Sequence, residues 1–184
     1  ATTQRQAVAY DADGLRLWEA PLPEVCTAGP VRLDDSTAVL GCRDGSLHAL
    51  DIATGAIQWT YKVPGDVAVA PLVSGEIVYV VDLSNQLTAI QAGEELWSIE
   101  LAATPQGWAI PLNGGALFVS NFADEEVLRF DPATGESLGV EWVGDSGVLV
   151  PFEQGVAISL PAMTVSLGHP NAISYAGPVR SLTS

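Results

Sequence analysis

LHALDIATGAIQW, residues 47–59, contains two runs of alternating apolar residues separated by a turn. The first run ends at Asp51, Thr54 and Gly55 mark the turn, and the second run ends at Trp59. Alternation with a period of two is typical of β-strands with one buried face, and Asp, Thr and Gly favour tight turns. The stretch therefore predicts a β-hairpin, which can be one copy of a repeat.

The hairpin does recur along the chain. The position of Asp51 is occupied in the other copies by Asp11, Gln91 and Asp131, and an apolar residue precedes each of them. A proline landmark has the same spacing and is found at Pro30, Pro71, Pro111 and Pro151. The chain is therefore built from units of about 40 residues, a period typical of repeat architectures.

Each unit contains four short apolar runs bounded by turn residues. In one unit, strands are expected over 68–73, 77–82, 86–91 and 95–101, and no segment has a sustained helical period. Four strands in about 40 residues predict a propeller blade. The predicted fold class is all-β: a β-propeller of four-stranded antiparallel blades with about four repeats.

The repeated residues have structural roles. The carboxylates of Asp11, Asp51 and Asp131 can accept hydrogen bonds from backbone N–H groups in the turns that follow them. The rings of Trp18, Trp59 and Trp97 fall on the outermost strand, where each can wedge between blades and donate to a neighbour's backbone. These six residues are interpreted as parts of the repeat rather than as a catalytic site.

DGSLHALDIATGAIQW, residues 44–59, resembles the pyrroloquinoline-quinone-type propeller repeat, whose pattern is DGxLYALDxxTGxxxW. The resemblance extends over most of the chain and implies a ring of W-shaped blades. Such rings occur in quinone-dependent dehydrogenases and in non-catalytic scaffolds such as the outer-membrane assembly lipoprotein. The third copy departs from the pattern with Gln91, and the fourth has Gly139 where tryptophan is expected.

The repeats divide the chain into two parts. Residues 1–167 are predicted to form a half blade, three full blades and a half blade, and residues 168–184 a C-terminal tail or arm. The two half blades can close a four-bladed ring, two copies can form an eight-bladed ring, or a longer chain can supply the rest. Relatives of this repeat usually have seven or eight blades. We therefore expect another chain or segment to complete the propeller. The completed ring would then have seven or eight blades.

Composition restricts the partners. The chain carries 22 acidic and 7 basic residues, a formal net charge of -15, which repels phosphate backbones and argues against nucleic acid. Its apolar runs are interrupted by Pro and Gly and are shorter than the roughly 20 residues that a membrane helix needs. The start, ATTQRQ, fits either a processed mature chain or a piece of a longer protein.

Cys26 and Cys42 are the two cysteines of the chain, and they lie symmetrically about a predicted turn at residue 34. They can form a cross-strand disulfide or remain two buried thiols; the disulfide is favoured and implies an oxidising, extracytoplasmic location such as the periplasm or cell surface. A zinc site is not predicted, because two thiols without a nearby His fall short of four ligands.

Other polar residues carry no catalytic prediction. His48 and His169 are isolated, and a packed, hydrogen-bonded His48 is expected. Residues 124–126 share an expected face with Glu24, Asp66 and Asp145, but they lack the alternating carboxylate spacing that wraps calcium, so a solvated loop is preferred.

Two tryptophans break the repeat pattern. Trp108 falls on the innermost strand, where it either fills the central channel or offers a stacking platform. Trp142 follows the atypical outer strand and can be an interface anchor. Both are candidate interface residues.

The sequence thus predicts a non-enzymatic, extracytoplasmic scaffold that binds protein partners or associates with itself. No cofactor, metal or catalytic residue is assigned. The alternative is a fragment of a quinone-dependent dehydrogenase, which would need calcium carboxylates and a catalytic Asp that cannot be assembled from these residues.

Overall fold

A computed structural model describes residues 2–3, 5–103, 105, 107–110, 115–121, 126–143, 148–152, 155–159 and 164–167. Within these residues the secondary structure is entirely β, arranged as five antiparallel sheets. The chain divides into two compact units, residues 1–101 and 102–184, and each unit is described by itself. None of the described residues forms a helix long and apolar enough to cross a membrane.

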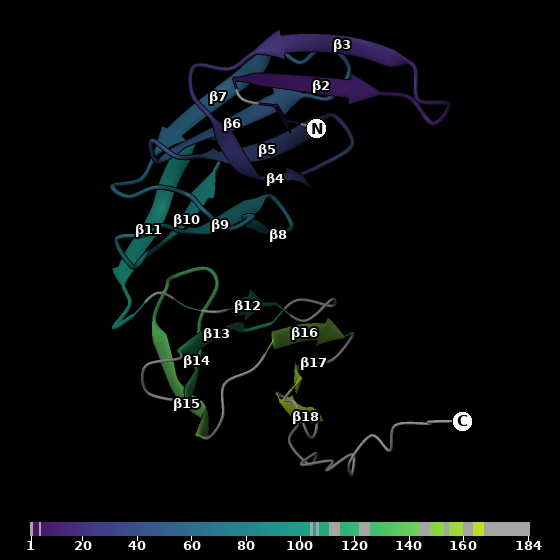
Figure 1. Cartoon of the computed structure of the whole chain (residues 1–184). Coiled ribbons are helices and arrows are strands. Elements are labelled where there is room, and N and C mark those ends of the chain that lie inside the picture. The colour runs from purple at the N-terminus through teal and green to yellow at the C-terminus, as the bar shows by residue number, and fades with distance from the viewer. Residues whose placement is uncertain are drawn as a thin grey trace, which may run out of the picture. The chain divides into compact units, whose positions relative to one another are not determined.

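The first unit contains three sheets, coloured purple to teal in Figure 1. The first sheet consists of β1 (Thr2–Thr3), β2 (Gln6–Tyr10) and β3 (Arg16–Pro21). The second sheet consists of β4 (Cys26–Arg32), β5 (Thr37–Cys42), β6 (Ser46–Asp51) and β7 (Ile57–Lys62). The third sheet consists of β8 (Leu72–Ser74), β9 (Ile77–Val81), β10 (Gln86–Gln91) and β11 (Glu94–Glu100).

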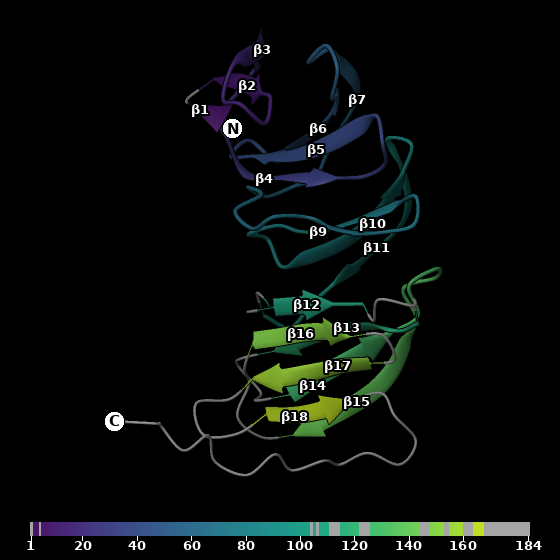
Figure 2. The same ribbon diagram turned by 90° about the vertical axis from the view of Figure 1, so that its right-hand side faces the viewer.

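The second unit contains two further sheets, coloured from teal through green to yellow in Figure 1. The fourth sheet consists of β12 (Gly107–Ala109), β13 (Leu117–Asn121), β14 (Glu126–Phe130) and β15 (Ser137–Val143). The fifth sheet consists of β16 (Val148–Phe152), β17 (Gly155–Ser159) and β18 (Thr164–Leu167). In Figure 2 the three strands of the fifth sheet alternate in direction, as their antiparallel pairing requires.

Each four-stranded sheet is a simple meander in which strands that follow one another in sequence are paired. In three of the sheets the strand register shifts at a β-bulge or similar irregularity. The shift directly follows Ala9, Ala49 and Ala89, respectively. Each of these alanines lies opposite a tryptophan, Trp18, Trp59 or Trp97. The small alanine leaves room for the ring across the strand, and the bulge increases the local twist of the outer strand.

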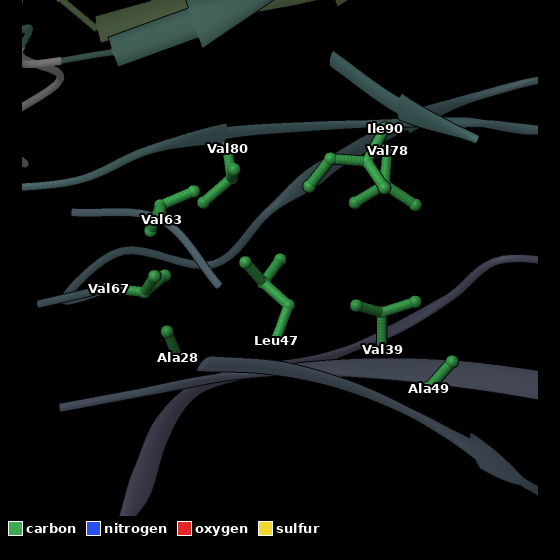
Figure 3. Packing of buried hydrophobic residues seen from close by; sticks show 9 residues of the cluster. All are labelled: Ala28, Val39, Leu47, Ala49, Val63, Val67, Val78, Val80 and Ile90. Atoms are coloured by element: carbon green, nitrogen blue, oxygen red, sulfur yellow. The ribbon is translucent and has the colours of Figure 1, made fainter. Parts of the chain in front are cut away.

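The main core of the first unit lies between the second and third sheets (Figure 3). Val39, Leu47 and Ala49 come from the second sheet, and Val78, Val80 and Ile90 from the third; Ala28, Val63 and Val67 complete the cluster. All nine side chains are almost fully buried. The alternating apolar pattern therefore places one face of each sheet against its neighbour, as blade packing requires.

The innermost strand of the third sheet is shorter than expected. The sequence predicts a strand over 68–73, whereas β8 begins at Leu72. The backbone N–H of Val67 instead donates to the carbonyl of Cys42 at 3.0 Å, in the preceding sheet, and Pro71 has no N–H to donate. The segment before β8 is thus used for contact between sheets rather than for pairing within one.

The last sheet has one more strand than a half blade. β18 pairs with β17 from Val156↔Leu167 to Ser159↔Thr164. This pairing occupies the edge of β17 on which β2 would have to pair to close a four-bladed ring. A simple four-bladed closure would therefore require β18 to leave that edge.

Candidate functional site

The repeated aspartates hold the turns between the third and fourth strands of the blades. Oδ1 of Asp51 accepts from the N–H and the hydroxyl of Thr54, at 2.7 and 2.8 Å. Those hydrogen bonds keep the pKa of Asp51 below its usual range. Asp11 accepts from the N–H groups of Asp13 and Leu15, and Asp131 from those of Ala133 and Thr134. The three carboxylates are engaged by their own turns.

The tryptophans of the outer strands pack against turn glycines of the following sheet. The ring of Trp18 lies under Gly55, where an added Cβ would be 2.6 Å from a ring carbon, and its Nε1 donates to the carbonyl of Ile52 at 2.8 Å. Trp59 lies in the same way under Gly93. Trp97 is buried, and its ring centroid is 5.9 Å from that of Tyr79 in the same sheet.

The fourth sheet uses a different arrangement at this position. Gly139 lies opposite Arg129, where the first three sheets pair tryptophan with alanine. Arg129 Nη1 forms an ion pair of 3.0 Å with Oε2 of Glu141, on the same outer strand. Its Nε is buried and has no hydrogen-bond partner among the described residues. The fourth sheet therefore lacks the Trp–Ala pair and contains an Arg–Glu pair in its place.

The two off-pattern tryptophans lie in the same sheet. Trp108 is on the short inner strand β12, is partly buried, and pairs with Val119. Trp142 lies on β15 opposite Val127, but its side chain is outside the described part of the structure. On the same strand, Leu138 and Val140 are exposed. The structure thus leaves the interface roles of both tryptophans as predictions.

An apolar hollow of about 340 Å³ lies between the first and second sheets. We call this cavity the apolar hollow; it is lined by Ala7, Val8, Ala9, Tyr10, Trp18, Pro30, Ala38, Leu40, Leu50 and Ile52. Its rim carries Tyr10, which is 55% exposed, and Ile52, which is 36% exposed. β1 pairs with β2 at Gln6 and Ala7, and Ala7 packs with Leu40 and Leu50 of the second sheet.

A second hollow, of about 410 Å³, lies between the second and third sheets. Its lining is more polar and includes Asp34, Thr37, Gln58, Glu76 and Gln91. The hydrogen bonds that Ser36 donates keep the pKa of Asp34 below its usual range. Of the two, the apolar hollow is the better match for an apolar protein side chain.

Cys26 and Cys42 lie directly opposite one another on β4 and β5, and a disulfide joins them. His48, on β6, has a ligand-capable nitrogen within 4.8 Å of both sulfurs, and all three residues are buried. Nδ1 of His48 is 2.9 Å from the hydroxyl oxygen of Thr60. Burial lowers the pKa of His48, an effect that the carboxylate of Asp44 partly opposes. The sequence missed this proximity, although His48 and Cys42 occur on adjacent strands of one hairpin.

A second residue that the sequence analysis missed is Asp82, which is 1% exposed. Its carboxylate accepts from the N–H groups of Gly65, Ser84 and Gln86 at 2.8, 2.8 and 3.1 Å. Gly65 belongs to the segment that joins the second and third sheets, so Asp82 fixes that connection. Asp82 lies 40 residues after Cys42, so the repeat aligns the two positions, although the residues there differ.

The remaining acidic candidates do not gather into a cation site in the described structure. Within the described residues, Cys26, Cys42 and His48 form the one group of three potential metal ligands. Glu24 accepts from the N–H of Val25 at 2.7 Å, and Asp66 is exposed. Asp124, Glu125, Asp145 and His169 lie outside the described residues.

One polar link joins the outer strands of the second and third sheets. The hydroxyl of Tyr61, on β7, donates to the carboxylate of Glu95, on β11. Burial and this carboxylate raise the pKa of Tyr61 to about 12. The link lies beside the Trp59–Gly93 contact, so apolar and polar contacts hold the two sheets together.

The comparisons with known proteins agree on the fold. The family model described as "Outer membrane protein assembly factor BamB" matches residues 4–145. The crystal structure of BamB from Moraxella catarrhalis superposes with a TM-score of 0.69 at 21% identity, covering 87% of this chain. The computationally designed Ika4 protein superposes with a TM-score of 0.56 at 17% identity, covering 79% of this chain and 87% of its own. The predicted β-propeller fold of four-stranded blades is confirmed.

The chain spans 60% of the length of the Moraxella catarrhalis structure. A search of the curated proteins found no match. The resemblance to the pyrroloquinoline-quinone-type repeat, which the sequence predicts from residues 44–59, is confirmed by the family model and by the structural match.

Proposed function

Because this chain belongs to the family of the outer membrane protein assembly factor BamB, we propose that it is a non-catalytic, extracytoplasmic propeller that binds protein. The observation that carries the proposal is the apolar hollow between the first two sheets. Its rim residues, Tyr10 and Ile52, are exposed, and Trp18 lies in its lining. A concave apolar surface with aromatic residues is typical of sites that anchor a partner's side chain.

Charge and covalent structure support the class of partner and the location. A net charge of -15 repels nucleic acid and leaves protein as the expected partner. A disulfide between Cys26 and Cys42 is stable in an oxidising compartment, which fits the outer-membrane factor named by the family.

The partner can be a different protein or a second copy that completes the propeller. The proposed arrangement keeps residues 1–167 as repeats and residues 168–184 as a tail or arm that reaches the partner. A strand supplied from outside could extend the first sheet over the apolar hollow.

A photo-crosslinking amino acid at residue 10, on the rim of the hollow, tests the proposal in cells that make the full chain. We expect covalent protein adducts after irradiation, and their mass distinguishes a second copy of 19.2 kDa from a different partner. The matched control carries the same amino acid at residue 83, because Leu83 has a similar exposure, 56%, but does not line the hollow.

Adducts at residue 10 that are absent at residue 83 would support the proposal. Equal labelling at the two positions, or no protein adduct at residue 10, would count against a docking role for the hollow. A fractionation of the same cells checks the location, and recovery of the chain with cytoplasmic markers would contradict the extracytoplasmic assignment.

A further inference from the structure

The disulfide of the second sheet lies beside a histidine that has the right chemistry to be a metal ligand. The two sulfurs and an imidazole nitrogen all lie within 4.8 Å of one another. With Zn–S near 2.3 Å and Zn–N near 2.0 Å, tetrahedral ligation places sulfur and nitrogen roughly 3.5 Å apart. Small side-chain rotations are therefore enough to bring the three donors to one metal ion once the sulfurs are separate.

His48 is prepared to act as a neutral ligand. Its Nδ1 is engaged with the hydroxyl of Thr60, whereas Nε2 is buried and has no hydrogen-bond partner among the described residues. If Nδ1–H donates to Thr60, the Nε2 lone pair is left available, and a second hydrogen bond that fixes the tautomer is typical of metal-bound histidines.

The three donor residues are buried away from water. They supply three of the four ligands of a tetrahedral zinc site. Cys26, Cys42 and His48 are 2%, 0% and 3% exposed, and the cysteines pack with Leu40 and Leu50. Leu40 and Leu50 also line the apolar hollow, so the cluster lies next to the hollow's floor. Two thiolates and an imidazole select soft d10 ions, and a fourth position would be open on Zn²⁺.

From this geometry we infer that reduction of the Cys26–Cys42 bond creates a buried binding site for a thiophilic metal ion, Zn²⁺ or Cu⁺, with Cys26, Cys42 and His48 as ligands. A dithiol reductant supplies two electrons and two protons: the protein disulfide becomes two thiols and the dithiol becomes a disulfide. Binding of the ion then releases both thiol protons, as thiolate ligation requires. The oxidised chain has no thiolate and does not bind.

The test uses the full chain, reduced under anaerobic conditions and separated from the reductant. Zn²⁺ and, in a second arm, Cu⁺ are added, and bound metal is measured by elemental analysis together with alkylation of the two thiols. We expect about one ion per chain, protection of both cysteines from alkylation, and no binding by the oxidised chain. The two arms distinguish which ion the site prefers.

His48→Thr is the informative variant, because the corresponding position in the third sheet is Thr88, whose hydroxyl lies 3.0 Å from that of Ser98. A threonine at position 48 can make the same cross-strand contact with Thr60 while it removes the nitrogen ligand. We expect metal affinity to fall by about tenfold or more, with the β-sheet circular dichroism and the oxidised chain's stability close to the parent.

Three results would overturn the inference. The first is a reduced, folded chain whose cysteines alkylate equally fast with and without metal. The second is His48→Thr binding the ion as tightly as the parent, which would leave the thiols as the site and His48 as a packing residue. The third is a reduced chain that unfolds and does not refold when metal is added.

Discussion

Cys42 and Asp82 occupy the same repeat position and make different links. In the third sheet a buried carboxylate, Asp82, holds the connecting segment through the N–H of Gly65. In the second sheet the position 40 residues earlier is Cys42, which is bonded to Cys26 at the start of β4. One repeat position thus carries a disulfide within the second sheet and a hydrogen-bonded carboxylate in the third.

The first prediction concerns this disulfide. Intact-mass analysis of the purified chain should show both cysteines protected from alkylation until a reductant is added. The cysteines are 16 residues apart, and the chain-entropy relation gives a stabilisation of about 3 kcal/mol for a loop of this size. The free energy of unfolding of the double variant Cys26→Ser/Cys42→Ser should fall by that order. Alkylation of both thiols without prior reduction would contradict the prediction.

The second prediction concerns Tyr61, whose pKa rises from 10.0 to about 12 in the folded chain. The folded state therefore favours the neutral phenol, and this contribution is complete below pH 10 and is lost as the pH rises towards 12. Denaturant titrations between pH 9 and 12 should show a loss of stability that is smaller in Tyr61→Phe.

The control for this series is Tyr10→Phe, because Tyr10 is exposed and its hydroxyl has no role in the link to Glu95. Its pH profile should match that of the parent chain. Identical profiles for Tyr61→Phe and Tyr10→Phe would show that the Tyr61–Glu95 bond has no measurable effect.

At the scale of elements, the recurring device is a tryptophan from one sheet under a glycine turn of the next. Gly55 and Gly14 both have positive φ, 76° and 81°, but only Gly55 has a tryptophan ring beneath it. An added Cβ at Gly14 meets nothing within 4 Å. A comparison of Gly14 with Gly55 therefore separates the energetic cost of positive φ in the turn from the cost of disturbing the packing between sheets.

The third prediction uses this pair. Gly14→Ala should cost about 1–2 kcal/mol from positive φ alone. Gly55→Ala should cost a further 1–3 kcal/mol, because its Cβ would lie 2.6 Å from the ring of Trp18. The free energies of unfolding of the two variants give the difference. Equal losses would mean that the Trp18 ring moves aside without cost.

At the scale of the whole molecule, the fourth repeat differs from the first three sheets in lacking the Trp–Ala pair. Gly139 faces Arg129 instead of a tryptophan facing an alanine, and Leu138 and Val140 are exposed on the same strand. Exposed apolar residues on an outer strand are typical of surfaces that another element covers.

The fourth prediction is that the fourth repeat and the tail contribute to assembly. Removal of residues 168–184, or Trp142→Ala, should lower the assembled fraction in light scattering more than it perturbs the sheets around Trp59 and Trp97. Near-ultraviolet circular dichroism monitors those sheets. A folded monomer of 19.2 kDa, with a thermal stability that neither change affects, would instead favour a closed ring and would refute the interface.

The fifth prediction is that added quinone and calcium produce no oxidation of alcohols or sugars. The reason is that the calcium ligands and the catalytic Asp of the dehydrogenases were not assembled from the sequence. A dye-reduction assay with a panel of such substrates checks this. Reproducible dye reduction that depends on both additives would overturn the non-enzymatic assignment.

The sequence by itself determined the fold class and most of the strands. β10 lies at 86–91 as predicted, and β9 and β11 agree to within one residue at each end. The reason is local: alternation of apolar residues and turn chemistry act over a few neighbours and are repeated every 40 residues or so. The predicted start of β8 was wrong: Val67, just before the predicted strand, donates its N–H to Cys42 in the preceding sheet, an interaction that no local pattern carries.

Only the tertiary structure decided which side chains meet across strands and sheets. His48 reaches Cys26 and Cys42 because strand register places them on one face, and Asp82 reaches Gly65 because two sheets pack together. The apolar hollow likewise depends on how the first two sheets pack, because its lining residues come from both. Such contacts join residues that are distant along the chain, and a one-residue change of register would move every one of these side chains to the opposite face.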